Sequence, residues 1–119
     1  MSFNPDEFFC HSDGTILQGG FVTTMLDASM AFLIMQILEF KKVPLSIDIN
    51  VNFLASGGPK LTIAEAKVIK IGKSIAFSSA ELFQGNQLIA TASSSIKLKD
   101  FQSKNWINQT IGKNLKIIK

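Results

Sequence analysis

Two adjacent glycines and one aspartate are the residues in this sequence with the clearest potential for chemistry. Gly19 and Gly20 precede a long apolar run, and Asp27 lies inside that run, seven residues after the second glycine. The first N–H groups of a helix have no acceptor within the helix, and glycine lets a ligand approach them closely. A helix that begins here would therefore offer a site for a negatively charged oxygen, either of a bound anion or of a carbonyl under attack.

Asp27 places a carboxylate in a segment that otherwise suits a protein core, where an unpaired charge is costly. Helical spacing puts it on one face with Thr23 and Thr24. A carboxylate close to a backbone anion site could activate water or attack a carbonyl carbon itself. The alternative is a structural aspartate that bonds to strand amides, to Ser46 or to Asn50.

The composition is that of one globular domain. The chain has 119 residues, of which 46% are hydrophobic and 18% charged. The net charge of +3 comes largely from lysines in the last third, which form either a solvated surface or an attraction for a phosphorylated ligand. No basic stripe alternates with aromatic residues, so nucleic-acid binding is not expected. The start, MSFNPDEFF, lacks the features of a signal peptide, which predicts a cytoplasmic protein.

Metal ligands are scarce. Cys10 is the only cysteine and His11 the only histidine, so we expect neither a disulfide framework nor a metal site.

Residues 21–40 are expected to form one long helix, because they contain no proline or glycine and are apolar nearly all round. Such a helix is buried on most sides. Its length would also suit a membrane span, but polar residues such as Asp27 argue against insertion. We therefore expect a core helix in a soluble protein.

Four strands are expected after the helix. From Ser46 onward apolar and polar residues alternate, and the pairs Gly72-Lys73 and Gly85-Asn86 predict tight turns. Short connections favour an antiparallel meander, and a curved sheet wrapped round the helix would give an α+β fold. The expected strands are 46–54, 61–71, 74–83 and 87–98, within a domain of residues 1–99, followed by a C-terminal extension of residues 100–119.

Four stretches in order carry a family resemblance. They are GTILQGGFVTTMLDAS (14–29), SIDINVNFL (46–54), IGKSIAFSSAEL (71–82) and LIATA (88–92). Together they resemble the hot-dog-fold acyl-CoA thioesterases, in particular the phenylacetic-acid-degradation type within the 4-hydroxybenzoyl-CoA thioesterase superfamily. The resemblance implies a hot-dog fold, homodimers or homotetramers, and hydrolysis of acyl-CoA thioesters without a metal or an organic cofactor.

The resemblance also implies roles for particular residues. The family pattern reads Asn-x-x-Gly-x-x-His-Gly-Gly, with Gln for His in some branches, followed by an acidic residue in the helix. Gln18, Gly19, Gly20 and Asp27 match its last part. Asp27 would be the general base or nucleophile, the amide of Gly19, with that of Gly20, would polarise the thioester carbonyl, and Gln18 would orient it. Ser46 matches a position that can carry a water-positioning hydroxyl.

The substrate-binding residues depart from the family pattern. The Asn position is taken by His11 if one extra residue precedes Gln18, and by Ser12 otherwise. Thr24 shares the helical face of Asp27. Lys73, together with the lysines that follow the helix, could meet the phosphates of coenzyme A or could simply be solvated.

The segment before this loop is shorter than is usual in the family. Either the sheet lacks an edge strand or MSFNPDEFF supplies a brief one, and an exposed edge would be covered by a partner copy or by the C-terminal residues.

Two other functions compete with hydrolysis. The replaced Asn and the shortened start favour a non-catalytic hot-dog protein that binds acyl-CoA or another acyl ligand. A hot-dog dehydratase would need a well-placed histidine, and His11 lies upstream of the glycine pair.

Overall fold

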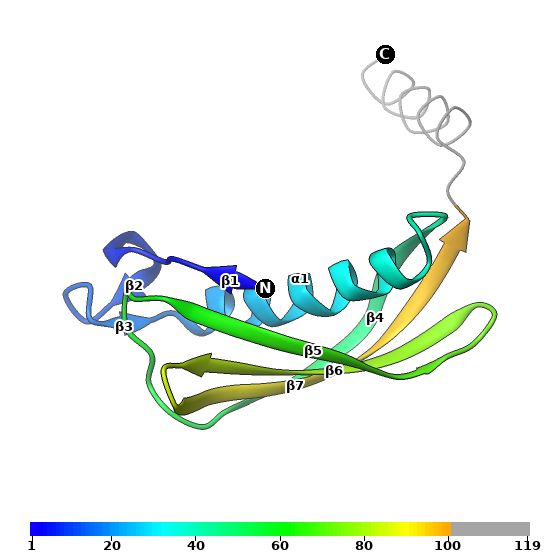
Figure 1. Cartoon of the computed structure of the whole chain (residues 1–119). Coiled ribbons are helices and arrows are strands. Elements are labelled where there is room, and N and C mark those ends of the chain that lie inside the picture. Colours follow the sequence, from blue (N-terminus) through cyan, green and yellow to red (C-terminus); the bar gives the residue numbers. More distant parts are fainter. Residues whose placement is uncertain (101–119) are drawn as a thin grey trace, which may run out of the picture.

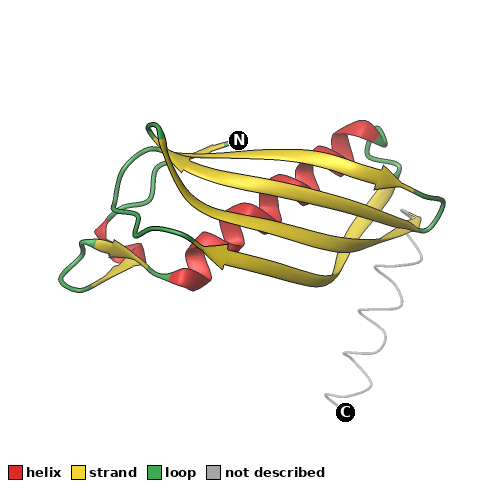
Figure 2. Cartoon of the chain, turned by 90° about the horizontal axis from the view of Figure 1, so that it is seen from below, coloured by secondary structure: helices red, strands yellow, loops and turns green. Residues whose placement is uncertain are grey.

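A five-stranded antiparallel sheet with one long helix across it makes up most of the computed structural model, which describes residues 1–100 (Figure 1). The strand order is β1-β5-β6-β7-β4, and β2 and β3 form a separate two-stranded hairpin. Seen from below, the long strands run side by side with the helix crossing behind them (Figure 2). The elements are β1 (Ser2–Phe3), the 3-10 turn η1 (Glu7–Phe9), β2 (Cys10–His11), β3 (Ile16–Leu17), α1 (Gly19–Ile37), β4 (Lys42–Phe53), β5 (Thr62–Ile71), β6 (Ile75–Gln84) and β7 (Gln87–Asp100).

These elements confirm the α+β class and the antiparallel meander of β5, β6 and β7. Contrary to the prediction, β4 is not part of this meander, because it pairs with β7 and not with its successor β5. The N-terminal residues supply the brief edge strand, because Ser2 pairs with Ile63 of β5. The expected C-terminal extension lies outside the described residues, apart from Asp100, which ends β7.

The limits of the helix differ from the prediction at both ends. It begins at Gly19 because the N–H groups of Phe21 and Val22 both donate to the carbonyl of Gln18, which closes the first turn around the glycines. It ends at Ile37 and not at residue 40. Glu39 and Phe40 adopt the left-handed conformation, with φ of 54° and 59°, which stops the helix.

α1 buries one face against small residues of the sheet. Three of its side chains, Leu26, Met30 and Ile34, are completely buried. Because the sheet residues beneath them have short side chains, the helix can lie close to the strands. These buried sheet residues include Ala64, Ala76, Ala80, Ala90 and Ala92.

The other side of α1 is open in a single chain. Phe32 and Ile37 remain 42% and 50% exposed, so the sheet does not cover the helix on most sides as predicted. By length and composition α1 could cross a membrane, but its contacts with four strands make it the core helix of the sheet.

β4 begins four residues earlier than predicted, at Lys42, and runs antiparallel to α1 at the edge of the sheet. Its pairing with β7 shifts between Ser46 and Asp48, so that Ile47 is the extra residue of a β-bulge. Ser46 pairs with Ile96, and Phe53 with Ala90, both of which are buried beneath the helix. Ser46 and Phe53 therefore lie on the face of β4 that looks towards α1.

The loop between β4 and β5 depends on one buried amide. The side chain of Gln84 accepts from the N–H of Gly58 at 3.0 Å and donates to the carbonyl of Gly58 and to the hydroxyl of Thr62, both at 2.9 Å. Gln84 is only 3% exposed, so water cannot easily replace its side chain as the hydrogen-bond partner of Gly58 and Thr62.

Replacing Gln84 by leucine should destabilise the protein by about 2–4 kcal/mol, because buried polar groups lose their partners. Urea unfolding measures this change. Gln87→Leu, the same substitution at an exposed position, should cost less than about 0.5 kcal/mol. Equal losses in the two variants would contradict the role given to the buried amide.

Candidate active site

The antiparallel run of α1 and β4 brings Asp27 and Ser46 together. The hydroxyl of Ser46 donates to Oδ1 of Asp27 at 2.8 Å. Asp27 is half-buried and Ser46 is exposed, so the pair lies at the surface between helix and edge strand. This bond agrees with the structural alternative for Asp27 and equally with a catalytic carboxylate. Among the described residues no cation pairs with Asp27, and Oδ2 has no hydrogen-bond partner.

The first turn of α1 leaves two backbone donors free. Within residues 1–100 no acceptor is recorded for the N–H groups of Gly19 and Gly20, whereas the next two N–H groups bond to Gln18. A Cβ added to Gly20 would meet nothing within 4 Å in the described chain, and one added to Gly19 would lie 3.3 Å from two ring atoms of Phe53. The two amides can therefore donate to an oxygen from outside this chain.

The hydroxyl of Thr24 is directed back into the helix. It donates to the carbonyl of Gly20 at 2.9 Å, and the hydroxyl of Thr23 donates in the same way to Gly19. Thr24 therefore lies on the expected face, but its donor is already used.

The free amides and the carboxylate lie apart in one chain. Asp27 is the eighth residue after Gly19 in the α-helix, which corresponds to a rise of about 12 Å along the axis. A reacting carbonyl and its attacking water are only about 3 Å apart. Within one chain the structure therefore does not bring the Gly19–Gly20 amides together with the Asp27–Ser46 pair, although the sequence suggested that they were neighbours.

Three of the predicted residues lie in the β2–β3 hairpin or directly after it, at the start of the helix (Figure 1). His11 and Ser12 are exposed, and Nδ1 of His11 lies 2.9 Å from the hydroxyl of Ser12. Gln18 is the N-cap residue, and its side chain makes no capping hydrogen bond. The N–H of Gln18 donates to the carbonyl of Phe9 at 3.0 Å, which ties the start of α1 to the N-terminal segment. These residues thus lie at the same end of the protein as the free amides.

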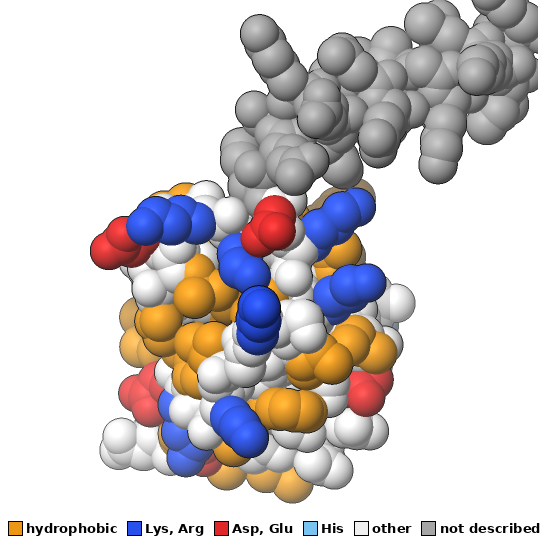
Figure 3. All heavy atoms as spheres, turned by 90° about the vertical axis from the view of Figure 1, so that its right-hand side faces the viewer, with side chains coloured by type: hydrophobic (Ala, Val, Ile, Leu, Met, Phe, Trp, Pro, Cys, Tyr) orange, Lys and Arg blue, Asp and Glu red, His pale blue; other side chains and the backbone are white. Residues whose placement is uncertain are grey.

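Lys73 lies at the opposite end, in the turn between β5 and β6. Its carbonyl accepts from Nζ of Lys42 at 3.1 Å, and Lys42 also pairs with Asp100 at 3.4 Å. Strand register places Lys97 and Lys99 near the same end. Figure 3 shows lysine side chains gathered on this side of the molecule. Lys73 is therefore separated from His11 and Ser12, and it belongs to a lysine-rich end of the sheet.

Cys10 is poorly suited to act as a nucleophile. Desolvation, and then the carboxylates of Asp6 and Glu7, raise the pKa of its thiol, which disfavours the thiolate. In the described part of the chain, no group of three or more His, Cys, Asp or Glu side chains is placed to hold a metal ion.

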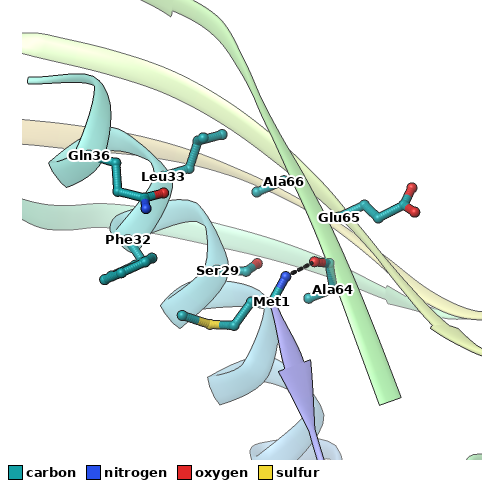
Figure 4. Close-up of a pocket in the computed structure, with 8 residues that line it drawn as sticks. All are labelled: Met1, Ser29, Phe32, Leu33, Gln36, Ala64, Glu65 and Ala66. Atoms are coloured by element: carbon teal, nitrogen blue, oxygen red, sulfur yellow. Dashed lines mark hydrogen bonds between the residues drawn. The ribbon is translucent and has the colours of Figure 1, made fainter. Parts of the chain in front are cut away.

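A cavity of about 280 Å³ lies between the second half of α1 and β5 (Figure 4). Ser29, which lines it, is two residues beyond Asp27 and therefore points about 200° away round the helix axis. The cavity and the carboxylate thus occupy different sides of α1. Nothing in the sequence singled out this cavity, since its only signal is the small side chains on β5. Its lining is Met1, Ser29, Phe32, Leu33, Gln36, Ala64, Glu65 and Ala66.

Solved structures share this architecture. A phenylacetic acid degradation-related protein from Ralstonia eutropha JMP134 aligns with a TM-score of 0.76 at 26% identity, over 81% of this chain and 72% of that chain. A thioesterase from Haemophilus influenzae aligns with a TM-score of 0.78 at 18% identity, over 87% and 72%. A protein from Bacillus halodurans solved with CoA aligns with a TM-score of 0.75 at 15% identity, over 82% and 64%. The last two show the fold alone.

The sequence itself matches the model of the thioesterase superfamily over residues 14–91, which is more than half of the chain. A search of curated proteins gave no significant match. The matched segment contains both the helix N-terminus and the Asp27–Ser46 pair. The chain therefore belongs to the thioesterase superfamily and is a thioester hydrolase.

Proposed function

We propose that this protein hydrolyses acyl-CoA thioesters with Asp27 as the general base. The observation that carries the proposal is a half-buried carboxylate whose Oδ1 accepts from Ser46 at 2.8 Å, while its Oδ2 has no hydrogen-bond partner among the described residues. This bond fixes the carboxylate at the surface and leaves Oδ2 for a water molecule. Ser46 is then a positioning residue. The CoA bound to the protein from Bacillus halodurans, which has the same fold, supports CoA as the thiol component.

In the proposed reaction, side chains and backbone groups of the protein act directly on the substrate and one water molecule. Asp27 takes a proton from a water molecule while the oxygen of that water bonds to the thioester carbon. The electron pair of the carbonyl π bond moves onto the carbonyl oxygen. The N–H groups of Gly19 and Gly20 stabilise that oxyanion. The carbonyl then re-forms, the C–S bond breaks, and the proton on Asp27 passes to the departing sulfur. The products are a free acid and the CoA thiol, so the proposal includes neither metal nor organic cofactor.

Asp27 could also act as the nucleophile. Its carboxylate would then attack the thioester carbon and release CoA, and water would hydrolyse the resulting anhydride. Both routes use the same carboxylate and give the same products.

The active site is proposed to form between two copies of the chain. β4 has a free edge, on which Leu45 and Ile47 are 46% and 57% exposed, and an exposed apolar edge strand favours pairing with another strand. If β4 pairs with itself across a two-fold axis, its two copies run antiparallel. The free amides at the Phe53 end of one chain would then approach Asp27 of the partner subunit. A homodimer therefore resolves the separation of about 12 Å between these groups along α1.

The lysine-rich end is suited to the phosphates of CoA. Lys42 and Ser46 lie on the same face of β4, four residues or about 13 Å apart. A thioester held beside Ser46 could thus place its phosphates near Lys42 and Lys73, where ammonium groups act as point charges.

Asp27→Asn should lower kcat for acyl-CoA hydrolysis by about 10²–10⁴-fold, because the amide cannot accept the proton. Ser46→Ala should lose less, about tenfold, because the carboxylate remains but is free to rotate. Release of free thiol from a panel of acyl-CoA esters measures both effects. Retained turnover in Asp27→Asn would refute the role of Asp27. CoA esters that bind without turnover to the unmodified protein would favour a non-catalytic binding protein.

Mixing two inactive variants tests the shared site. Asp27→Asn removes the base, and Gly20→Val places a side chain over the free amides. After subunit exchange, about half of the dimers are mixed, and each of these has one intact site, so activity should recover to about a quarter of the wild-type value. No recovery in mixtures shown to contain mixed dimers would place both groups in one chain. Mixtures of Asp27→Asn with itself serve as the control.

A further inference from the structure

Phe53 is the last residue of β4, and its ring lies over the start of α1. The ring atoms Cε1 and Cζ are both 3.3 Å from the position of a Cβ on Gly19. The absence of a side chain at Gly19 therefore lets the ring lie directly beside the free amides. Phe53 itself is on the helix-facing side of the strand, in line with the half-buried Ile49 and Val51.

The position of Phe53 is fixed, yet its side chain is not part of the core. Its backbone pairs with Ala90, and the next two residues both donate to the carbonyl of Ile89, at 2.8 and 3.1 Å. The ring nevertheless remains 58% exposed. Phenylalanine is usually well buried, so a large ring that remains exposed on a well-paired backbone has apolar surface available for another group.

The chemistry around Phe53 favours the acyl group as that neighbour. Once the thioester oxygen is bound by the amides of Gly19 and Gly20, the acyl carbon chain starts within a few ångströms of the ring. The adjacent Leu54 is also apolar and 56% exposed. The CoA moiety carries amides in its pantetheine arm and phosphates beyond it, which suit the polar Ser46 of the partner subunit and the lysine-rich end of the partner's β4 in the proposed shared site. An apolar wall beside the amides is suited to hydrocarbon.

We propose that Phe53 is the residue that selects the acyl group, by limiting the room beside the oxyanion site; this inference rests on the proposed acyl-CoA hydrolysis. The ring admits short acyl groups and forces longer or wider ones away from the amides. A smaller side chain at this position opens the site to bulkier substrates.

The test compares kcat/KM for acetyl-, butyryl-, octanoyl- and benzoyl-CoA in the full-length protein and in Phe53→Leu and Phe53→Ala. The ratio of kcat/KM for octanoyl-CoA to that for acetyl-CoA should rise at least about tenfold in Phe53→Ala, with Phe53→Leu between the two. Phe77→Ala is the matched control, because Phe77 is 42% exposed on β6 and faces away from the helix. Its ratio should stay at the wild-type value.

Each outcome bears on the proposal. A ratio that stays constant, or an equal loss for every acyl group, would overturn the role of Phe53 while leaving the proposed hydrolysis intact, provided that Asp27→Asn is inactive. The same change of ratio in Phe77→Ala would also overturn it. Absence of turnover in the wild-type protein would remove both proposals. Should the alanine variant not fold, Phe53→Leu, which keeps an apolar side chain against Gly19, gives the decisive ratio.

Discussion

The close packing of α1 on the alanine-rich face of the sheet is the constraint on which the site depends. Leu26, Met30 and Ile34 are completely buried against short side chains, which fixes the height and rotation of the helix above the strands. With the rotation fixed, Asp27 must project from the side of the helix next to β4. The same rotation lays the first turn against the end of that strand. The core thus determines which functional groups the surface can present.

Helix geometry then divides the chemistry between two places. A helix can offer free N–H groups only at its start, whereas a side chain one or two turns along can be half-buried and oriented by a neighbouring strand. Gly19 and Asp27 use these two properties of the same helix, and their separation along the axis is the reason why a single chain is an incomplete catalyst in the proposed mechanism. In the proposed mechanism the same separation along the helix therefore makes catalysis depend on dimerisation.

Much of the fold could be read from local patterns. The apolar run predicted the helix, and the alternation after Ser46 predicted the four long strands. The turns at Gly72 and Gly85 predicted the antiparallel pairing of β5, β6 and β7, but no local pattern predicted that β4 pairs with β7 and not with β5. The residues at which helices and strands end were harder to predict from the sequence. The helix stops where Glu39 and Phe40 turn left-handed, which neither residue type favours, and β4 begins at Lys42, which has no apolar neighbour before it.

The site was predictable in part, for a related reason. The pairing of Asp27 with Ser46 was among the options that the sequence offered, and the structure places the two in contact. The location of Lys73 far from His11, and the contact of Phe53 with Gly19, depend on how strands from distant parts of the sequence line up. Such tertiary contacts leave no local pattern. The role of Gln18 in orienting the thioester carbonyl, and those of His11, Ser12 and Thr24 in substrate binding, remain predictions.

The bulge at Ile47 has a consequence for how this strand can change. Before the bulge the even-numbered residues of β4 face the helix, and after it the odd-numbered residues do. Ser46 and Phe53 therefore lie on the same face of β4, whereas in a strand without a bulge they would lie on opposite faces. Losing this single residue would turn either the hydroxyl or the ring outward. The length of β4 at this one point, and not only its residue types, is therefore what keeps the hydroxyl of Ser46 and the ring of Phe53 on the side of the sheet that carries α1.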